Sequence, residues 1–447
     1  MTLAELIPSL RRSLPHPLEP WLWPSSTHHI PGGDLSVGGA SLVGVAAQYG
    51  TPAYVLDLAE FRARCATYRQ AFHGADVAYA GKALLTRAVA RIVDDEGLSL
   101  DVCSAGELAL AADVQFPADR LILHGNAKPA SLLRRAMPMG VGRIVVDSLD
   151  EIATLAAVGF GSGRQRVLLR VTPDVDAHTH RAMTTGTDDQ KFGLSITSGA
   201  AAEAVRRALA TPSLELVGVH CHIGSQVTRT APYEQMVARL VAFLAAVRDE
   251  HGLALPELNL GGGHAIAYHP GDVPLGVGDI AAALRRSVKA ACATHRLPVP
   301  RLTVEPGRAI AGPAGITVYR VLAVKHTPAR TWVAVDGGLS DNPRPALYGA
   351  RYTARLLGRL SPAADEHVTV VGQHCEAGDV LIEDALLPAD VRYGDLLAVP
   401  STGAYHHSMA SNYNLTPRPP LIGVAEGRSQ VLVRRETVDD LLARDLG

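Results

Sequence analysis

From about residue 52 to residue 302, short runs of apolar and β-branched residues alternate with longer stretches of helical periodicity. Two neighbouring parallel strands need a crossover connection, usually a helix, so this alternation predicts βα units around a parallel sheet. About eight such units close a (β/α)8 barrel. The expected strands are 53–56, 77–81, 100–103, 121–124, 143–147, 167–171, 216–222 and 257–260.

The character of the chain changes near residue 301. Beyond it, strand-like segments follow one another with Gly- and Pro-containing turns, which is typical of a mostly antiparallel β domain. Residues 1–48 are rich in Pro and Gly with a short strand pattern near 35–43, and we expect them to join that β domain. A chain of 447 residues is too long for one hydrophobic core. We therefore predict an N-terminal segment at 1–48, an α/β barrel at 49–302 and a β-sandwich or β-barrel domain at 303–447.

Charge and cysteine usage exclude several classes of protein. The 42 Lys and Arg residues face 44 Asp and Glu residues, so no net basic charge points to nucleic acid or to an anionic membrane. The five cysteines are scattered and lack CxxC spacing, which indicates reduced thiols in a cytoplasmic protein and argues against structural zinc. Residues 1–24 have no continuous apolar core, so we expect neither a signal peptide nor a membrane span.

Lys82 stands at the end of the expected strand 77–81, and a helical stretch begins near Thr86. In (β/α)8 barrels the chemistry collects at the carboxyl ends of the strands. A lysine that is buried there beside cations or apolar walls has a lowered pKa and can attack a carbonyl group. Taken alone, the position is more typical of a rim lysine with its ammonium group in water.

Three further groups of residues lie at the ends of strand-like runs. His220 and His222 are two residues apart and therefore share one face of the strand. They could bind a metal together. Alternatively, one is a core residue and the other a pocket residue, or one imidazole stacks on a flat cofactor. Gly261–Gly263 suits a phosphate nest or a tight turn. Glu305 and Arg308 are costly to bury unpaired. Glu305 could therefore bind a ring nitrogen and Arg308 an anion, or the two could form a salt bridge with each other.

Polar residues of the expected β domain suit a charged ligand. Arg344 lies shortly before Tyr348, and a planar guanidinium beside a phenol suits a carboxylate. Glu376 suits an ammonium group, and Tyr405 adds a hydroxyl group after an expected strand. Each of these residues taken alone is more typical of a protein surface.

Together the motifs resemble the pyridoxal-phosphate-dependent decarboxylases with an alanine-racemase-type barrel, in collinear order from about Val37 to Leu442. The motifs of the barrel part are Tyr79-Ala80-Gly81-Lys82, the run from Leu100 to Glu107, Asp189 to Gly193, His222 to Gln226, Gly261 to Gly263 and Glu305 to Arg308. Those of the β part are Asp336 to Gly338, Asn342 to Tyr348, Cys375-Glu376 with Gly378-Asp379, and Gly403 to Tyr405.

The resemblance implies pyridoxal 5'-phosphate as the cofactor and no metal. Lys82 would hold the cofactor as a Schiff base, His222 would stack on its pyridine ring and Glu305 would pair with the ring nitrogen. The catalytic residues implied are Lys82, Cys375 and His222. The cofactor-binding residues implied are Lys82, Asp101, His222, Ser225, Gly262, Gly263, Glu305, Gly307, Arg308 and Tyr405.

The resemblance also implies a reaction, the decarboxylation of meso-2,6-diaminopimelate to L-lysine and carbon dioxide, which is the last step of lysine biosynthesis. Cys375 would donate a proton to the α-carbon, and Glu376 would bind the distal amine. Both would reach the pocket from a partner subunit, so we expect a homodimer in which the β domain completes the active site. The substrate-binding residues implied are Arg308, Arg344, Tyr348, Glu376 and Tyr405.

Three places depart from the family's usual pattern. His264-Ala265 replace a Leu/Phe-Gly pair after the glycines, His406-His407 replace residues that are more often aromatic or Cys, and Asn126-Ala127-Lys128 differs from the more usual double Asn. These changes leave the reaction type intact. They keep open a paralogue that decarboxylates another amino acid, such as ornithine, lysine, arginine or a precursor of secondary metabolism.

Other classes of protein fit less well. A metal-dependent barrel hydrolase would need the histidines as ligands, and a racemase would need another catalytic group in place of Cys375-Glu376. A binding protein without activity would be expected to have lost Lys82 or the phosphate glycines, which are present.

Overall fold

The computed structural model describes residues 17–159, 163–176 and 185–447, so the first 16 residues of the expected N-terminal segment lie outside the described residues. The chain divides into two compact units. The barrel unit comprises Arg64–Ala265 and Pro274–Ala309. The β unit comprises the described residues up to Ala63, Ile266–Val273 and Ile310–Gly447.

Parallel strands of the barrel unit form a closed sheet. Closure is made by β13 pairing with β5 and by β8 pairing with β9, and a short strand β10 (Leu194–Ser195) adds to β9. The predicted (β/α)8 barrel is therefore confirmed. Its strands are β5 (Asp76–Ala80), β6 (Ser99–Val102), β7 (Leu121–Leu123), β8 (Arg143–Val146), β9 (Gln165–Thr172), β11 (Leu214–His220), β12 (Glu257–Asn259) and β13 (Arg301–Val304).

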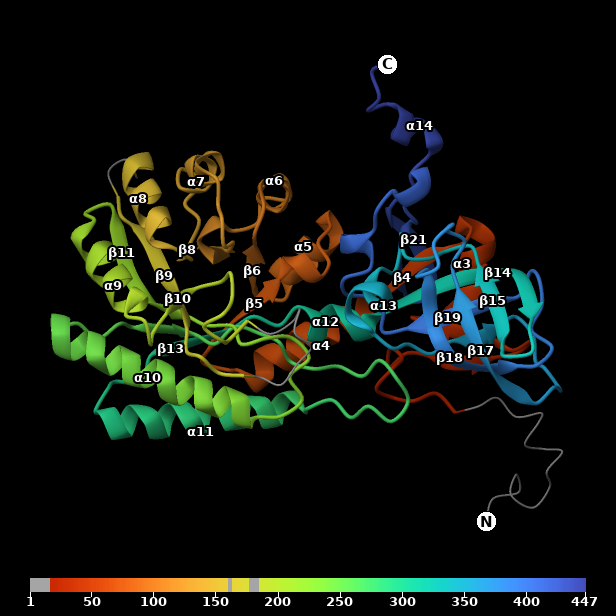
Figure 1. The fold of residues 1–447 in the computed structure, drawn as a ribbon, viewed down its shortest axis with the longest axis horizontal. Coiled ribbons are helices and arrows are strands. Elements are labelled where there is room, and N and C mark those ends of the chain that lie inside the picture. Colours follow the sequence, from red (N-terminus) through yellow and green to blue (C-terminus); the bar gives the residue numbers. More distant parts are fainter. Residues whose placement is uncertain (1–16, 160–162, 177–184) are drawn as a thin grey trace, which may run out of the picture. The chain divides into compact units, whose positions relative to one another are not determined.

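Several barrel helices begin at a capping residue in the loop that follows a strand. The side chains of Thr86, Ser104 and Ser148 each accept a hydrogen bond from a backbone N–H of the first helical turn. The helices α10 and α11 lie side by side (Figure 1). None of the described helices combines the length and the apolar character that a membrane crossing requires. The helices are α4 (Leu58–Ala71), α5 (Arg87–Asp95), α6 (Ala105–Asp113), α7 (Ala130–Ala136), α8 (Leu149–Val158), α9 (Ala200–Ala210), α10 (Ala231–His251) and α11 (Val277–His295).

The expected first barrel strand is wrong. Residues 53–56 belong to β4 (Ala53–Asp57), which lies between β14 and β20 in the sheet of the β unit. The barrel instead uses β13 (Arg301–Val304) as its eighth strand, and this strand falls where the sequence pattern changes. A short buried strand has the same local sequence pattern in either sheet, so only its pairing partners separate the two assignments.

The β unit contains a mostly antiparallel sheet in the order β18-β17-β15-β14-β4-β20-β21, with β16 and β19 attached through β14, and it confirms the predicted β domain. A second sheet joins β1 (His28–Ile30), β2 (Asp34–Val37) and β3 (Ala40–Ser41). The strands of the large sheet, besides β4, are β14 (Gly315–His326), β15 (Thr331–Val335), β16 (Arg355–Leu357), β17 (Asp365–Val371), β18 (Val380–Pro388), β19 (Leu396–Pro400), β20 (Leu421–Ala425) and β21 (Arg428–Val433). Its helices are α3 (Leu42–Tyr49), α12 (Arg308–Ala311, which begins in the barrel unit), α13 (Arg344–Tyr348) and α14 (Val438–Leu442).

One apolar core joins the N-terminal segment to the strands of the β unit. Leu22, Leu35 and Val45 pack in the same buried cluster as Val318 and Ile422. The expected strand pattern near 35–43 resolves into β2, β3 and the start of α3, because Ser41 caps that helix by accepting from the N–H of Gly44. The described part of the N-terminal segment therefore belongs to the β unit, as expected.

Lys128, in the segment Asn126-Ala127-Lys128 that departs from the family's usual pattern, is a buried structural residue of the barrel unit. Its Nζ donates to the carbonyl groups of Gly125 (2.6 Å) and Val145 (2.7 Å) and lies 2.8 Å from a carboxylate oxygen of Glu151. Burial lowers the pKa of Lys128, and the neighbouring carboxylate opposes that change. The ammonium group thus ties the loop after β7 to β8 and to α8.

We predict that Lys128→Met lowers the free energy of unfolding of the barrel unit by about 3–5 kcal/mol, because it leaves the Glu151 carboxylate buried without its partner. Adding Glu151→Leu should recover much of this loss, because both charges are then gone. Urea unfolding followed by circular dichroism measures both values. The exposed pair of Arg87 and Asp113 serves as a control, since Arg87→Met should change little. An equally small effect of Lys128→Met would contradict the structural role.

Candidate active site

The candidate lysine lies where strand β5 ends. Lys82 is exposed in a single 3-10 turn, Gly81–Ala83, directly after Ala80. The backbone N–H of Ala80 donates to the carbonyl of Pro306, 3.2 Å away. The glycine at 307 permits this approach, because a Cβ there would lie 3.0 Å from the carbonyl oxygen of Ala80. The lysine is therefore fixed beside the segment that carries Glu305 and Arg308.

A buried carboxylate occupies the same end of the barrel. Glu305 is 6% exposed, and its oxygens accept from His124 Nε2 (2.8 Å), His220 Nε2 (3.0 Å) and Asn259 Nδ2 (2.6 Å). Burial raises the pKa of Glu305, but the two histidines outweigh it and hold the pKa well below its usual value. Glu305 is therefore an anion that is held by residues from the ends of β7, β11 and β12.

The pKa values of the two histidines that bind Glu305 are shifted in opposite directions. Burial lowers the pKa of His220 to about 4, so its ring is neutral with the proton on Nε2. Burial also acts on His124, but Asp101 and Glu305 outweigh it and raise the pKa of that ring. Burial raises the pKa of Asp101 to about 6, and its carboxylate lies 3.9 Å from His124.

Among the described residues, His124, His220 and Glu305 lie close enough to hold a metal ion. Their Nε2 and carboxylate oxygen atoms are already at hydrogen-bond distance, which accounts for their proximity without an ion. A metal site formed by His220 and His222 was one interpretation of the sequence. In the structure, His222 does not belong to this cluster and makes a different contact. Its Nδ1 accepts from the N–H of Gly262 at 3.2 Å.

His222 presents a neutral ring near Lys82. Burial, with the nearby cation of Lys82, lowers the pKa of His222 well below its usual value. Since Nδ1 accepts from Gly262, the ring proton lies on Nε2. A neutral, fixed imidazole of this kind suits stacking on a flat aromatic ring.

The glycine motif forms a tight loop after β12. Gly261 and Gly263 have φ angles of +64° and +92°, which favour glycine. A Cβ at Gly262 would collide with the carbonyl of Glu305, and one at Gly263 with the carbonyl of Gly224. The loop can adopt this conformation only because these positions have no side chains. Its backbone N–H groups can then come close to an anion, as a phosphate nest requires.

A cation lies beside the residues that follow β11. Arg308 is buried, and its Nε and Nη2 donate to Ser225 Oγ at 3.2 and 3.0 Å. Glu305 is held by the histidines and Asn259, so the mutual salt bridge of Glu305 and Arg308 does not form. The barrel unit thus offers an amine, a neutral ring, a buried anion, a glycine cradle and a guanidinium, which fit the lysine-linked ring, the ring nitrogen and the phosphate of pyridoxal phosphate.

The remaining predicted site residues belong to the β unit. Arg344 is 2% exposed in α13, its Nη1 donates to the hydroxyl of Tyr352, and its guanidinium carbon lies 4.5 Å from the ring centre of Tyr268. No carboxylate of the described residues forms an ion pair with Arg344. His406 is buried with its ring 5.4 Å from that of Tyr352, and its Nδ1 binds the carbonyl of Ala404 at 2.9 Å.

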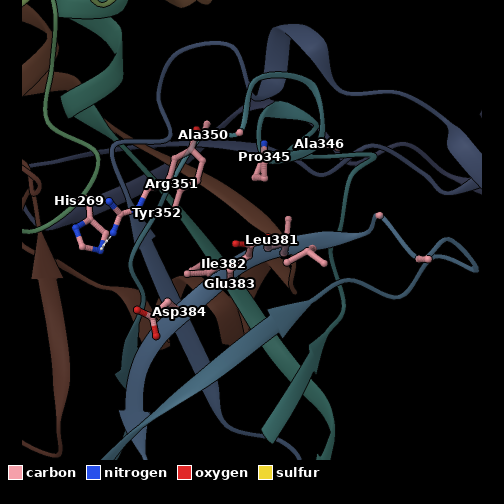
Figure 2. Close-up of a pocket in the computed structure, with 14 residues that line it drawn as sticks. His269, Pro345, Ala346, Ala350, Arg351, Tyr352, Leu381, Ile382, Glu383 and Asp384 are labelled. Atoms are coloured by element: carbon pink, nitrogen blue, oxygen red, sulfur yellow. Dashed lines mark hydrogen bonds between the residues drawn. The ribbon is translucent and has the colours of Figure 1, made fainter. Parts of the chain in front are cut away.

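A cavity of about 440 Å³ lies in the β unit beside α13 (Figure 2). Arg351 and His269 meet at its wall, where Nη2 of Arg351 lies 3.1 Å from Nε2 of His269. Ala377 and Gly378 also line the cavity, directly after Cys375-Glu376 in the chain.

Cys375 and Glu376 lie in the connection between β17 and β18, and both are exposed. The base of this connection is fixed by Asp379, which accepts from the N–H groups of His374 (2.9 Å) and Leu339 (2.6 Å). Tyr348 ends α13, and Tyr405 has a φ angle of +63°.

Sequence reasoning missed several residues that hold the site. His124 ends an expected strand, so its position at a strand end was a usable signal. Asn259 carries the same signal at the end of β12. Tyr268 and Tyr352 have no local signal, because their role comes only from packing against Arg344.

The chain is similar to known proteins over nearly its whole length. Residues 58–312 match the family described as pyridoxal-dependent decarboxylase, pyridoxal binding domain. The chain is 54% identical to a diaminopimelate decarboxylase of Actinosynnema pretiosum subsp. auranticum over 100% of both chains, and 46% identical to that of Mycobacterium tuberculosis over 96% of this chain and 98% of the relative.

A solved structure of diaminopimelate decarboxylase from M. jannaschii, in co-complex with L-lysine, superimposes with a TM-score of 0.89 at 31% identity, covering 95% of this chain and 99% of that chain. The similarity therefore spans both units and is not confined to the barrel. The chain belongs to the pyridoxal-dependent decarboxylases and, among them, to the diaminopimelate decarboxylases.

Proposed function

We propose that this protein decarboxylates meso-2,6-diaminopimelate to L-lysine and carbon dioxide, with pyridoxal phosphate as cofactor. The observation that carries the substrate assignment is Arg344, a buried guanidinium that lacks an anionic partner among the described residues. Such a cation is stabilised when a ligand carboxylate meets it. Diaminopimelate has a second carboxylate, which ornithine and lysine lack.

In this proposal the barrel unit holds the cofactor. Lys82 binds it covalently, Glu305 keeps its ring nitrogen protonated and His222 stacks on its ring. When bound, the protonated ring supplies the electron sink that accepts the electron pair left as carbon dioxide departs. The phosphate is assigned to Ser225, Gly262, Gly263, Gly307, Arg308 and Tyr405, and Asp101 is assigned to the same cofactor site.

The charge state of the Glu305 network supports this assignment. A carboxylate whose pKa is held well below its usual value stays ionised at neutral pH and favours a proton on a ring nitrogen that faces it. His124, His220 and Asn259 fill its remaining hydrogen-bonding capacity and fix its orientation. The protein thus sets the protonation of the ring before substrate arrives.

The substrate roles are assigned to other residues. Arg344 and Tyr348, with Arg308 and Tyr405, bind the distal carboxylate, and Glu376 binds the distal ammonium group. Cys375 donates the proton that replaces carbon dioxide on the α-carbon. The exposure of Cys375 and Glu376 supports their supply to a partner subunit, so we propose a homodimer. We also propose a cytoplasmic location, where the cysteine thiols stay reduced.

The first experiment measures carbon dioxide release from protein loaded with pyridoxal phosphate and given meso-diaminopimelate, L-lysine, L-ornithine or L-arginine separately. We expect turnover of diaminopimelate only. Turnover of one of the other three amino acids would instead identify a paralogue with another substrate. A colourless protein that binds zinc and no pyridoxal phosphate would contradict the family chemistry.

Arg344→Met should raise the KM for diaminopimelate, because a charge-assisted hydrogen bond of about 1.5–3 kcal/mol is lost. Arg351→Met is the matched control, since Arg351 is an exposed arginine of the same segment that binds His269. Initial-rate kinetics measure both variants. An unchanged KM for Arg344→Met, or an equal rise for Arg351→Met, would argue against the carboxylate role.

Mixing Lys82→Ala with Cys375→Ala should restore activity, although each variant alone should be nearly inactive. In a dimer with shared sites, random mixing recovers up to about a quarter of wild-type activity, because half of the dimers are mixed and carry one intact site. Subunit exchange is confirmed by mass spectrometry of differently tagged chains. No recovery after confirmed exchange would contradict the shared site.

A further inference from the structure

His264 is packed directly behind the glycine loop. It follows Gly263 without a spacer and is 3% exposed. Its ring lies parallel to those of Tyr68 (5.7 Å between centres, 2° between planes) and Phe72 (6.4 Å, 3°), and edge-on to Tyr233 (5.6 Å, 66°). Three aromatic side chains thus fix the orientation of the imidazole.

The two tyrosine hydroxyl groups of this cluster form hydrogen bonds. The hydroxyl of Tyr68 lies 2.9 Å from Nδ1 of His264. Burial lowers the pKa of His264 to about 4 and raises the pKa of Tyr68 above its usual value, so a phenol donates to a neutral imidazole. The hydroxyl of Tyr233 donates to the carbonyl of Gly262 at 3.0 Å.

The loop has no room to move independently of His264. The N–H of Val227 donates to the carbonyl of Gly263 at 2.9 Å, and Val227 and His264 form a parallel bridge. On the other side, the Cα of Gly263 is so close to the carbonyl of Gly224 that a Cβ would collide with it. A displacement of the His264 ring therefore shifts the backbone at Gly262 and Gly263.

We propose that His264, fixed by Tyr68, is a positioning residue that holds Gly262 and Gly263 in the shape that binds the phosphate of the cofactor. This inference rests on the proposed function, since it assumes that pyridoxal phosphate is the ligand. The inference explains why His264 stands where the family usually has Leu or Phe. Its hydrogen bond to Tyr68 adds a fixed polar contact behind the loop.

The test compares His264→Phe, Tyr68→Phe and the double variant. Each single variant leaves one buried polar atom without its partner, whereas the double variant replaces both by apolar groups of similar shape. We expect the dissociation constant of pyridoxal phosphate, from absorbance titration of the apoprotein, to rise about tenfold in His264→Phe. The double variant should recover most of that loss. The phosphorus-31 resonance of the bound cofactor should shift or broaden in the single variants.

A matched control separates positioning from stability. Arg143 pairs with Glu257 through two hydrogen bonds of 2.7 and 2.6 Å at the amino ends of β8 and β12, away from the loop. Arg143→Met should lower the melting temperature of the apoprotein and leave both the dissociation constant and the phosphorus-31 signal unchanged.

Two negative outcomes are distinguishable. If His264→Phe lowers the melting temperature but leaves cofactor affinity and the phosphorus-31 signal as in wild type, His264 is a core residue only and the inference is wrong. If wild-type protein binds no pyridoxal phosphate, the proposed function itself fails.

Discussion

The carboxylate of Glu305 is the charge around which the carboxyl ends of the barrel strands are organised. Its hydrogen-bond donors come from the ends of three other strands, β7, β11 and β12, so the site exists only once the barrel has closed. An unpaired carboxylate at this depth would be neutralised or would destabilise the fold. Held by these donors it stays ionised, and that ionisation is what a cofactor ring with a basic nitrogen requires.

Two of the buried cations among the described residues, Lys128 and Arg344, show how charge burial separates structure from function. Lys128 meets a carboxylate and two carbonyl groups, so its hydrogen-bonding capacity is spent within the protein. Arg344 meets two aromatic rings and one hydroxyl group. Aromatic faces stabilise a guanidinium while leaving its charge unneutralised. The second arrangement retains attraction for an anion from outside, and the first does not.

Much of this could be predicted from sequence because each strand end carries its own motif. Lys82, the glycines and Glu305 follow recognisable strands, and a barrel brings such ends together. The partners of Arg344 could not be predicted in the same way. Their contacts join segments far apart in the chain, as with Tyr268 and Arg344, and no local periodicity encodes them. Strand β4 was misassigned for the same reason.

The placement of β4 sets the order in which the protein can be built. This strand leaves the ribosome early, yet its two neighbours are β14 and β20, and β20 is among the last strands to be synthesised. Domains generally fold as units, and bringing distant segments together carries a loop-closure cost. The barrel residues that emerge in between can close first, while β4 waits with both edges unpaired. An exposed strand edge is a template for pairing with another chain, so an interrupted synthesis yields a folded barrel that carries an aggregation-prone strand.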